Sequence, residues 1–147
     1  MSLSLHVTGV NEAIEDLQNL PQDIRDNVSA EMENALGYAA SYAQSIAPVR
    51  TGYYRDEIGY EKVGDFEFFL YAGAPYSGVV EYGSMPHIIL PRNVSVLRFE
   101  VEGEVVFAKY VMHPGTQPQF ILTQAMDATE SMIEAAIESG IDKAIDP

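Results

Sequence analysis

The chain has 147 residues, of which 47% are hydrophobic and none is cysteine. This is enough material for one domain with a packed core, and it excludes disulfides, thiolate metal sites and cysteine nucleophiles. Eight basic residues against 22 acidic ones give a formal net charge of −14, so the chain should repel nucleic acid, because DNA binding depends on Lys and Arg that neutralise phosphates.

The acidic composition has two interpretations. Only three of the basic residues are lysines, and an acidic, lysine-poor surface is expected of a protein that works in concentrated salt, where charges are screened within about 3 Å at 1 M. The alternative is an ordinary acidic protein with basic partners.

No apolar run approaches the roughly 18 residues of a membrane span, and the N-terminus lacks the pattern of a signal peptide, so neither secretion nor membrane insertion is expected.

The first third of the chain predicts a strand and two helices. Apolar and polar residues alternate over 2–8, which indicates a short strand. A helix capped by Asn11 is expected to end at Pro21, where a second helix begins. This second helix carries an apolar stripe at steps of three or four over about six turns, and Pro48 ends it. The stripe consists of Ile24, Val28, Met32, Leu36, Ala39, Ala43 and Ile46.

The pattern then changes to the period of two that is typical of strands. Two aromatic-rich runs, 54–63 and 66–71, are separated by a turn and predict a hairpin. A short helix is expected over 75–82, ended by Gly83.

An extended arm is predicted over 84–95, because its prolines disfavour a central strand. Its apolar character is unusual for a free loop, and exposed apolar patches mark protein contacts. We therefore predict a subunit interface formed by Met85, Pro86, His87, Ile88, Ile89, Leu90 and Pro91. The alternative is that this arm folds onto the protein's own sheet.

A second hairpin is predicted after the arm. Residues 96–102 alternate between apolar and charged, and a tight turn at Glu102 and Gly103 leads into a strand over 104–110. The apolar side chains expected to face inward are Leu97, Phe99 and Val101.

The last element predicted is a helix over 116–140, ended by Gly140 and followed by a flexible tail over 141–147. Its inner side should consist of Ile121, Ala125, Ala128, Met132 and Ala136, with Ile133 and Ile137 as further candidates, while Glu130, Glu134 and Glu138 face water. The order of elements indicates a single α+β domain over 1–147. Its twisted antiparallel sheet should contain two hairpins and the N-terminal strand, packed by the long helix and the C-terminal helix.

Candidates for catalysis are few. A metal site from His87, His113 and Glu81 is conceivable, because imidazole and carboxylate suit zinc or iron, so a small metal-dependent hydrolase is one alternative function. Both histidines adjoin prolines, however, and turn histidines bonded to backbone carbonyls are the preferred interpretation. The sequence has no nucleophile elbow and no phosphate-binding loop, and no cofactor is expected.

Glu81 lies between Val80 and Tyr82 in a segment whose other residues indicate burial. A buried carboxylate is strongly unfavourable without a partner. We predict a structural ion pair of Glu81 with Arg50 or Arg55, which belong to a neighbouring motif.

Four motifs, in order along the chain, resemble a phage protein family. They are Ala-Pro-Val-Arg-Thr-Gly (47–52), Gly-Ala-Pro-Tyr-Ser-Gly-Val-Val-Glu-Tyr-Gly (73–83), Pro-His-Ile-Ile-Leu-Pro (86–91) and His-Pro-Gly-Thr-Gln-Pro-Gln-Phe (113–120). Each alone is weakly specific. Together, after a strand and two helices, they are similar to the tail-completion, or head–tail joining, family of long-tailed double-stranded DNA phages and related archaeal tailed viruses. The likeness covers nearly the whole chain.

The resemblance implies a non-enzymatic virion protein, assembled in the host cytoplasm, that forms a ring, commonly a hexamer, in the neck at the head–tail junction. Its partners would be neighbouring neck, connector and tail tube proteins, with DNA passing through the lumen without specific binding. A tail terminator or head-closure ring of the same neck is an alternative, as is an interaction module derived from a prophage. The lysine-poor surface departs from the family and favours a salt-adapted virus, such as one of an archaeal host.

Overall fold

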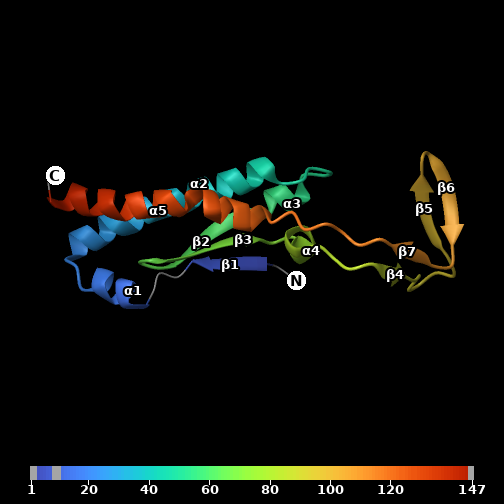
Figure 1. Ribbon diagram of the computed structural model, residues 1–147, viewed down its shortest axis with the longest axis horizontal. Coiled ribbons are helices and arrows are strands. Elements are labelled where there is room, and N and C mark those ends of the chain that lie inside the picture. The colour runs from blue at the N-terminus through green and yellow to red at the C-terminus, as the bar shows by residue number, and fades with distance from the viewer. Residues whose placement is uncertain (1–2, 8–10, 146–147) are drawn as a thin grey trace.

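The computed structural model describes residues 3–7 and 11–145. It shows an elongated body from which a long arm, residues 84–116, projects at one end (Figure 1). The body contains β1 (Leu3–Val7), α1 (Asn11–Gln18), α2 (Gln22–Ile46), α3 (Tyr53–Asp56), β2 (Ile58–Gly64), β3 (Glu67–Ala72), α4 (Ser77–Tyr82) and α5 (Ile121–Ile145). The arm contains β4 (His87–Ile89), β5 (Leu97–Val101), β6 (Glu104–Ala108) and β7 (Val111–His113). The predicted α+β class is confirmed.

The body has one antiparallel sheet of three strands in the order β1-β3-β2. β3 is the central strand, and its last residue, Ala72, is opposite Leu3 of β1 on one side and Ile58 of β2 on the other. The predicted first hairpin is therefore present as β2 and β3. The second hairpin lies outside this sheet, as a separate pair of strands, so the predicted sheet of two hairpins is wrong in that detail.

The strand that was predicted to start at Tyr54 starts only at Ile58, because a helical turn, α3, precedes it. Two backbone hydrogen bonds close this turn, from Asp56 N–H to the Gly52 carbonyl (2.9 Å) and from Glu57 N–H to the Tyr53 carbonyl (3.1 Å). Tyr54 and Ile58 are both buried. Their spacing of four residues fits a helical turn as well as it fits alternation in a strand.

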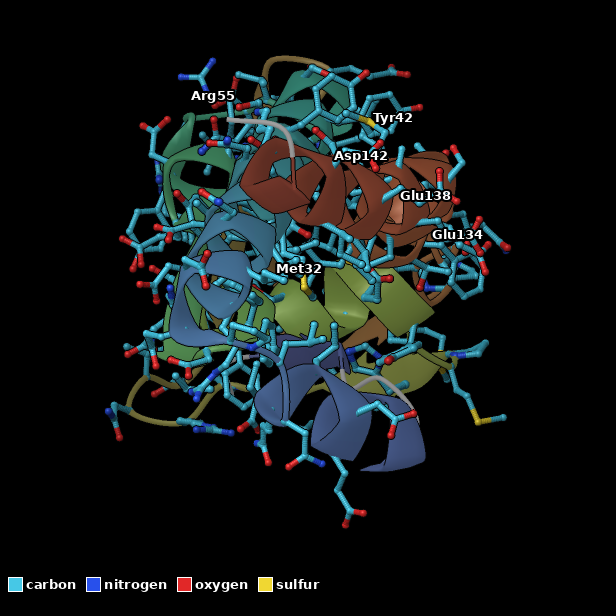
Figure 2. All side chains as sticks on the ribbon, turned by 90° about the vertical axis from the view of Figure 1, so that its left-hand side faces the viewer. Met32, Tyr42, Arg55, Glu134, Glu138 and Asp142 are labelled. Atoms are coloured by element: carbon cyan, nitrogen blue, oxygen red, sulfur yellow. The ribbon has the colours of Figure 1, made fainter. Side chains whose placement is uncertain are left out.

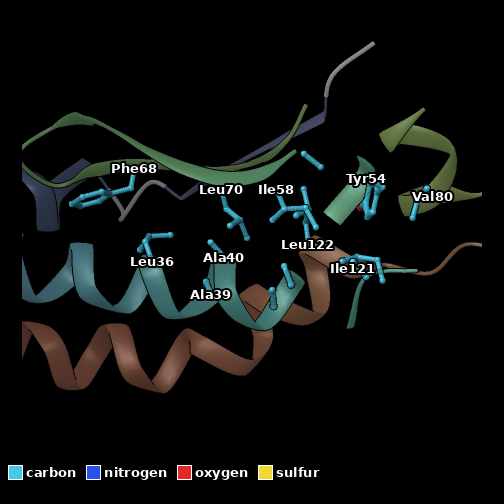
Figure 3. Packing of buried hydrophobic residues seen from close by; sticks show 14 of the residues in the cluster. Leu36, Ala39, Ala40, Tyr54, Ile58, Phe68, Leu70, Val80, Ile121 and Leu122 are labelled. Carbon is cyan, nitrogen blue, oxygen red and sulfur yellow. The ribbon is translucent and has the colours of Figure 1, made fainter. Parts of the chain in front are cut away.

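The core lies between α2 and the sheet. Leu36 and Ala40 of α2 face Phe68 and Leu70 of β3 (Figure 3), and Ala39 belongs to the same buried cluster. Each fully buried Leu or Phe side chain stabilises the fold by about 1.5–3 kcal/mol. The predicted apolar stripe is confirmed for Val28, Met32, Leu36, Ala39 and Ala43, which are buried, while Ile24 and Ile46 are partly buried against the same core.

The last helix, α5, lies along α2 and differs from the prediction at both ends. It starts at Ile121 rather than at residue 116, and it continues through Gly140 to Ile145. Gly140 does not end the helix. It is buried where α5 meets α2, and a Cβ atom added there would lie 2.5 Å from the Cα of Val28. The glycine therefore permits a backbone-to-backbone approach of the two helices.

The buried side of α5 is also rotated relative to the predicted one. Ala128 and Met132 are exposed, whereas Leu122 and Thr129 are buried. The reason is the close approach at Gly140, since residues 122, 125, 129, 136 and 140 share the face that turns toward α2. The prediction that Glu130, Glu134 and Glu138 face water is confirmed. Figure 2 shows the acidic side chains of Glu134, Glu138 and Asp142 along the outer side of this helix.

The arm consists of two small antiparallel pairs. β4 pairs with β7 in the outer part of the arm, and β5 pairs with β6 in a hairpin at the tip, which stands across the end of the arm (Figure 1). The predicted turn at Glu102 and Gly103 is present, with φ values of 53° and 87°. No residue from 82 to 120 is buried. The arm thus lacks an interior, and none of the described residues covers the face of Leu97, Phe99 and Val101 that was expected to point inward.

Candidate assembly surface

The base of the arm is attached to the body by Glu81 of α4, whose side chain is fully buried. Its carboxylate accepts hydrogen bonds from the backbone N–H groups of Leu122 and Thr123, both at 3.0 Å, and from the Thr123 hydroxyl at 2.7 Å. The first N–H groups of a helix have no partner within the helix, and the helix dipole favours negative charge there. Glu81 therefore caps the N-terminus of α5.

This cap replaces the predicted ion pair of Glu81 with Arg50 or Arg55. Arg55 contacts Asp56 at 3.0 Å on the surface, and Arg50 lies in the exposed loop before α3. Backbone dipoles satisfy a buried carboxylate without burying a second charge, which a buried ion pair would require. A signal for the cap was present in the sequence, because the residues just before Ile121 include no Ser, Thr, Asp or Asn that could cap this helix locally.

Backbone hydrogen bonds complete the joint between the two ends of the arm. Ser84 and Thr116 exchange a pair of them, at 2.9 and 3.0 Å. Gln119 N–H donates to the Val80 carbonyl at 2.9 Å. Gly83 closes α4 with φ 74°, and a Cβ atom on it would overlap the backbone that returns from the arm. The arm therefore leaves the body from a well-defined base.

The residues predicted as a subunit interface all lie in this arm. Met85 is 84% exposed and Leu90 63% exposed. The others are exposed too, except for the half-buried Pro91. Ile88 is opposite Met112 of β7, so the apolar surface is formed by β4 and β7 together. The sequence predicted the part on β4 but not the part on β7. Its role as an interface stays a prediction.

The tip hairpin has one apolar face. Its register places Leu97, Phe99 and Val101 opposite Ala108, Val106 and Glu104, and side chains that are directly opposite share a face. The other face carries Arg98, Glu100, Val105 and Phe107. A two-stranded hairpin is marginally stable in water unless another layer packs on it.

The two histidines of the arm meet across β4 and β7. The rings of His87 and His113 are stacked, with centroids 5.0 Å apart. The Nδ1 atom of His87 is 2.9 Å from the Met85 carbonyl oxygen, and Gly115 N–H donates to the Nδ1 atom of His113 at 3.1 Å. The predicted contact of a turn histidine with a backbone carbonyl is thus present at His87.

The third residue of the conceivable metal site does not join them. Glu81 is occupied at the N-terminus of α5. Among the side chains that the structure describes, no three His, Asp or Glu residues are grouped so that they could hold a metal ion.

A groove opens at the end of the body that carries the arm, between the loop after α2 and the start of α4. It has a volume of about 740 Å³ and is lined mainly by apolar surface of Pro48, Val49, Tyr53, Tyr54 and Tyr76, with Arg50 at the same site. The Tyr76 ring lies 6.5 Å from that of Tyr53 and 6.2 Å from that of Tyr54. Two of the motifs noted in the sequence, 47–52 and 73–83, meet here.

Tyr54 is a buried packing residue of this groove. Burial raises the pKa of Tyr54 to about 12, and the charges of Glu81 and Tyr76 add to the effect. Its hydroxyl makes no hydrogen bond to a described residue. The phenol therefore stays protonated at neutral pH.

None of the helices that the structure describes is long and apolar enough to cross a membrane.

Comparison with known proteins finds a family that resembles part of the body. Residues 11–83, from α1 to the end of α4, match the model of the HK97-gp10-like family, described as "Bacteriophage HK97-gp10, putative tail-component". The match includes Glu81 and the groove, and it ends where the arm begins. No curated protein and no solved structure matches the chain. Residues 11–83 therefore resemble the HK97-gp10-like family of phage tail components, which confirms the predicted resemblance of the chain to a phage tail and neck protein.

Proposed function

We propose that this structural tail component forms a ring, a hexamer, in the neck at the head–tail junction, with DNA passing through its lumen. The observation that carries the proposal is the arm. It projects from the body, it has no buried residue, and its apolar side chains extend over both of its strand pairs. Contiguous exposed apolar surface of this kind marks sites of protein–protein contact.

A projecting arm suits a ring of identical subunits. In a cyclic ring each interface joins two different faces, so that every subunit offers one face forward and another backward. The arm at one end of an elongated body supplies such a face. The predicted interface, residues 85–91, is then part of a larger contact that includes β7 and the tip hairpin. Neighbouring neck, connector and tail tube proteins would contact the faces of the ring.

The distribution of charge supports a conduit for DNA. Within the arm, Arg92, Arg98 and Lys109 balance Glu100, Glu102 and Glu104, so the rest of the chain carries the whole net charge of −14. Acidic bodies around a lumen repel the phosphate backbone. DNA could therefore pass without adhering, while the neutral arms bridge neighbouring subunits.

The experiment is to remove the arm without opening the body. Because Ser84 and Thr116 are joined by two backbone hydrogen bonds, residues 85–115 can be replaced by an Asn-Gly turn. Electron microscopy of the full chain should show rings with a central channel. The shortened chain should be monomeric by light scattering and should keep its helical circular dichroism. Rings formed by a shortened chain would contradict the proposal.

A further inference from the structure

We infer that the apolar face of the tip hairpin of one copy docks in the groove of the next copy, the groove lined by residues 48–54 and Tyr76, with Glu104 opposite Arg50. This inference rests on the proposed ring and names both halves of its interface. It commits to a second copy of this chain as the occupant of the groove.

The first argument is that the chain contains two apolar surfaces, one on a projecting hairpin and one in a groove. The hairpin face is a projecting one, formed by Leu97, Phe99, Val101, Val106 and Ala108. Val101 is 48% exposed although a strand residue of this kind is normally covered. The groove is concave, and its volume of about 740 Å³ is enough for several side chains. Docking would give the hairpin the second layer that it lacks.

The second argument is charge. Outside the arm, four cations form ion pairs with carboxylates of the same chain, as Arg25–Asp65, Arg55–Asp56, Lys62–Glu33 and Lys143–Glu31. Arg50 is the one Lys or Arg in the described part of the body without such a pair, and it lies at the groove. Its charge is therefore available at the groove for a carboxylate of a second copy.

Glu104 supplies the matching carboxylate. It lies at the turn of the hairpin, directly opposite Val101, and so belongs to the apolar face. It is exposed and forms no ion pair with a described residue. When the apolar face enters the groove, Glu104 is the charged group of that face that can reach Arg50. An ion pair at the edge of an apolar contact fixes register and orientation more than affinity.

Crosslinking tests the pairing directly, because the chain has no cysteine of its own. One chain carries Arg50→Cys, a second carries Glu104→Cys, and the mixture is treated with a short bismaleimide. A covalent dimer is expected from this mixture at several times the yield of a control with Glu100→Cys, since Glu100 lies on the opposite face of the hairpin. Equal yields from the two mixtures would overturn the inference.

Charge reversal gives a second, independent readout. Arg50→Glu and Glu104→Arg should each raise the dissociation constant of assembly about tenfold by turning an attraction into a repulsion. Mixing the two variants should restore assembly, because every interface in an alternating ring is then either original or doubly reversed. Glu100→Arg is the matched control and should have little effect. Assembly that is insensitive to these changes would overturn the docking but leave the ring, whereas a full chain that never assembles would overturn both.

Discussion

The carboxylate of Glu81 accepts both the backbone N–H (3.0 Å) and the hydroxyl (2.7 Å) of Thr123. Glu81 precedes the arm by three residues and Thr123 follows it by seven. The contact therefore joins the two segments of the body between which the arm is inserted. Together with the backbone bonds between Ser84 and Thr116, it ties the segments on both sides of the arm to one another.

The first prediction concerns this cap. Glu81→Ala should lower the free energy of unfolding by about 2–3 kcal/mol, because it removes three hydrogen bonds to a charged acceptor and leaves buried N–H groups at the start of α5 unpaired. Glu81→Gln keeps one acceptor oxygen and should lose less, about 1 kcal/mol. Urea unfolding measures both values.

The exposed carboxylate of Glu130 on the same helix provides the control. Glu130→Ala should stay within about 0.5 kcal/mol of the original chain, as surface substitutions usually do. If Glu81→Ala were as stable as Glu130→Ala, the carboxylate would not be the cap that the geometry indicates.

How far the sequence predicts this fold depends on the range of the interactions. The stripe of α2 was predicted because periodicity over 25 residues is a local signal. The hydrogen-bond partner of Glu81 was not predicted, because Leu122 is 41 residues away along the chain and arginines closer in sequence offered a simpler pairing. The tip hairpin was predicted from its turn. Its separation from the body was not, since alternation identifies an apolar face but not what covers it.

The second prediction concerns the contact of α5 with α2. Gly140→Ala should destabilise the fold by about 1–3 kcal/mol or more, because the added methyl group meets the backbone of Val28, which cannot rotate away as a side chain can. Gly78 in α4 is the control, since a Cβ atom there meets nothing within 4 Å. Gly78→Ala should be neutral or stabilising by about 0.4–1 kcal/mol. Thermal unfolding of the two variants, side by side, separates steric overlap from a general effect of losing glycine.

The third prediction is a dependence on alkaline pH. The pKa of Tyr54 is raised from 10.0 to about 12 in the folded chain. Between these values the unfolded chain loses the phenolic proton while the folded chain retains it, so the free energy of unfolding should fall as pH rises from 10 to 12. Below pH 10 Tyr54 keeps its proton in both the folded and the unfolded chain, so the stability that its burial contributes is fully present there.

Tyr54→Phe isolates this effect from the titration of the other tyrosines. At neutral pH the variant should be at least as stable as the original chain, since the lost hydroxyl has no hydrogen-bond partner among the described residues. Its stability should also fall less steeply above pH 10. Parallel slopes for the two chains would show that Tyr54 does not hold its proton more tightly when folded.

The fourth prediction concerns salt. The bodies carry the entire net charge of −14, and neighbouring bodies in a ring must come close together. Raising the ionic strength from 0.1 to 1 M shortens the screening length from about 10 to about 3 Å. Repulsion between bodies should weaken far more than the attraction of the single pair Arg50–Glu104, because many charges act at longer range. Assembly, followed by sedimentation velocity, should therefore strengthen as salt is raised. If the rings came apart instead, ion pairs would dominate the interface, and adaptation to concentrated salt would no longer explain the acidic body.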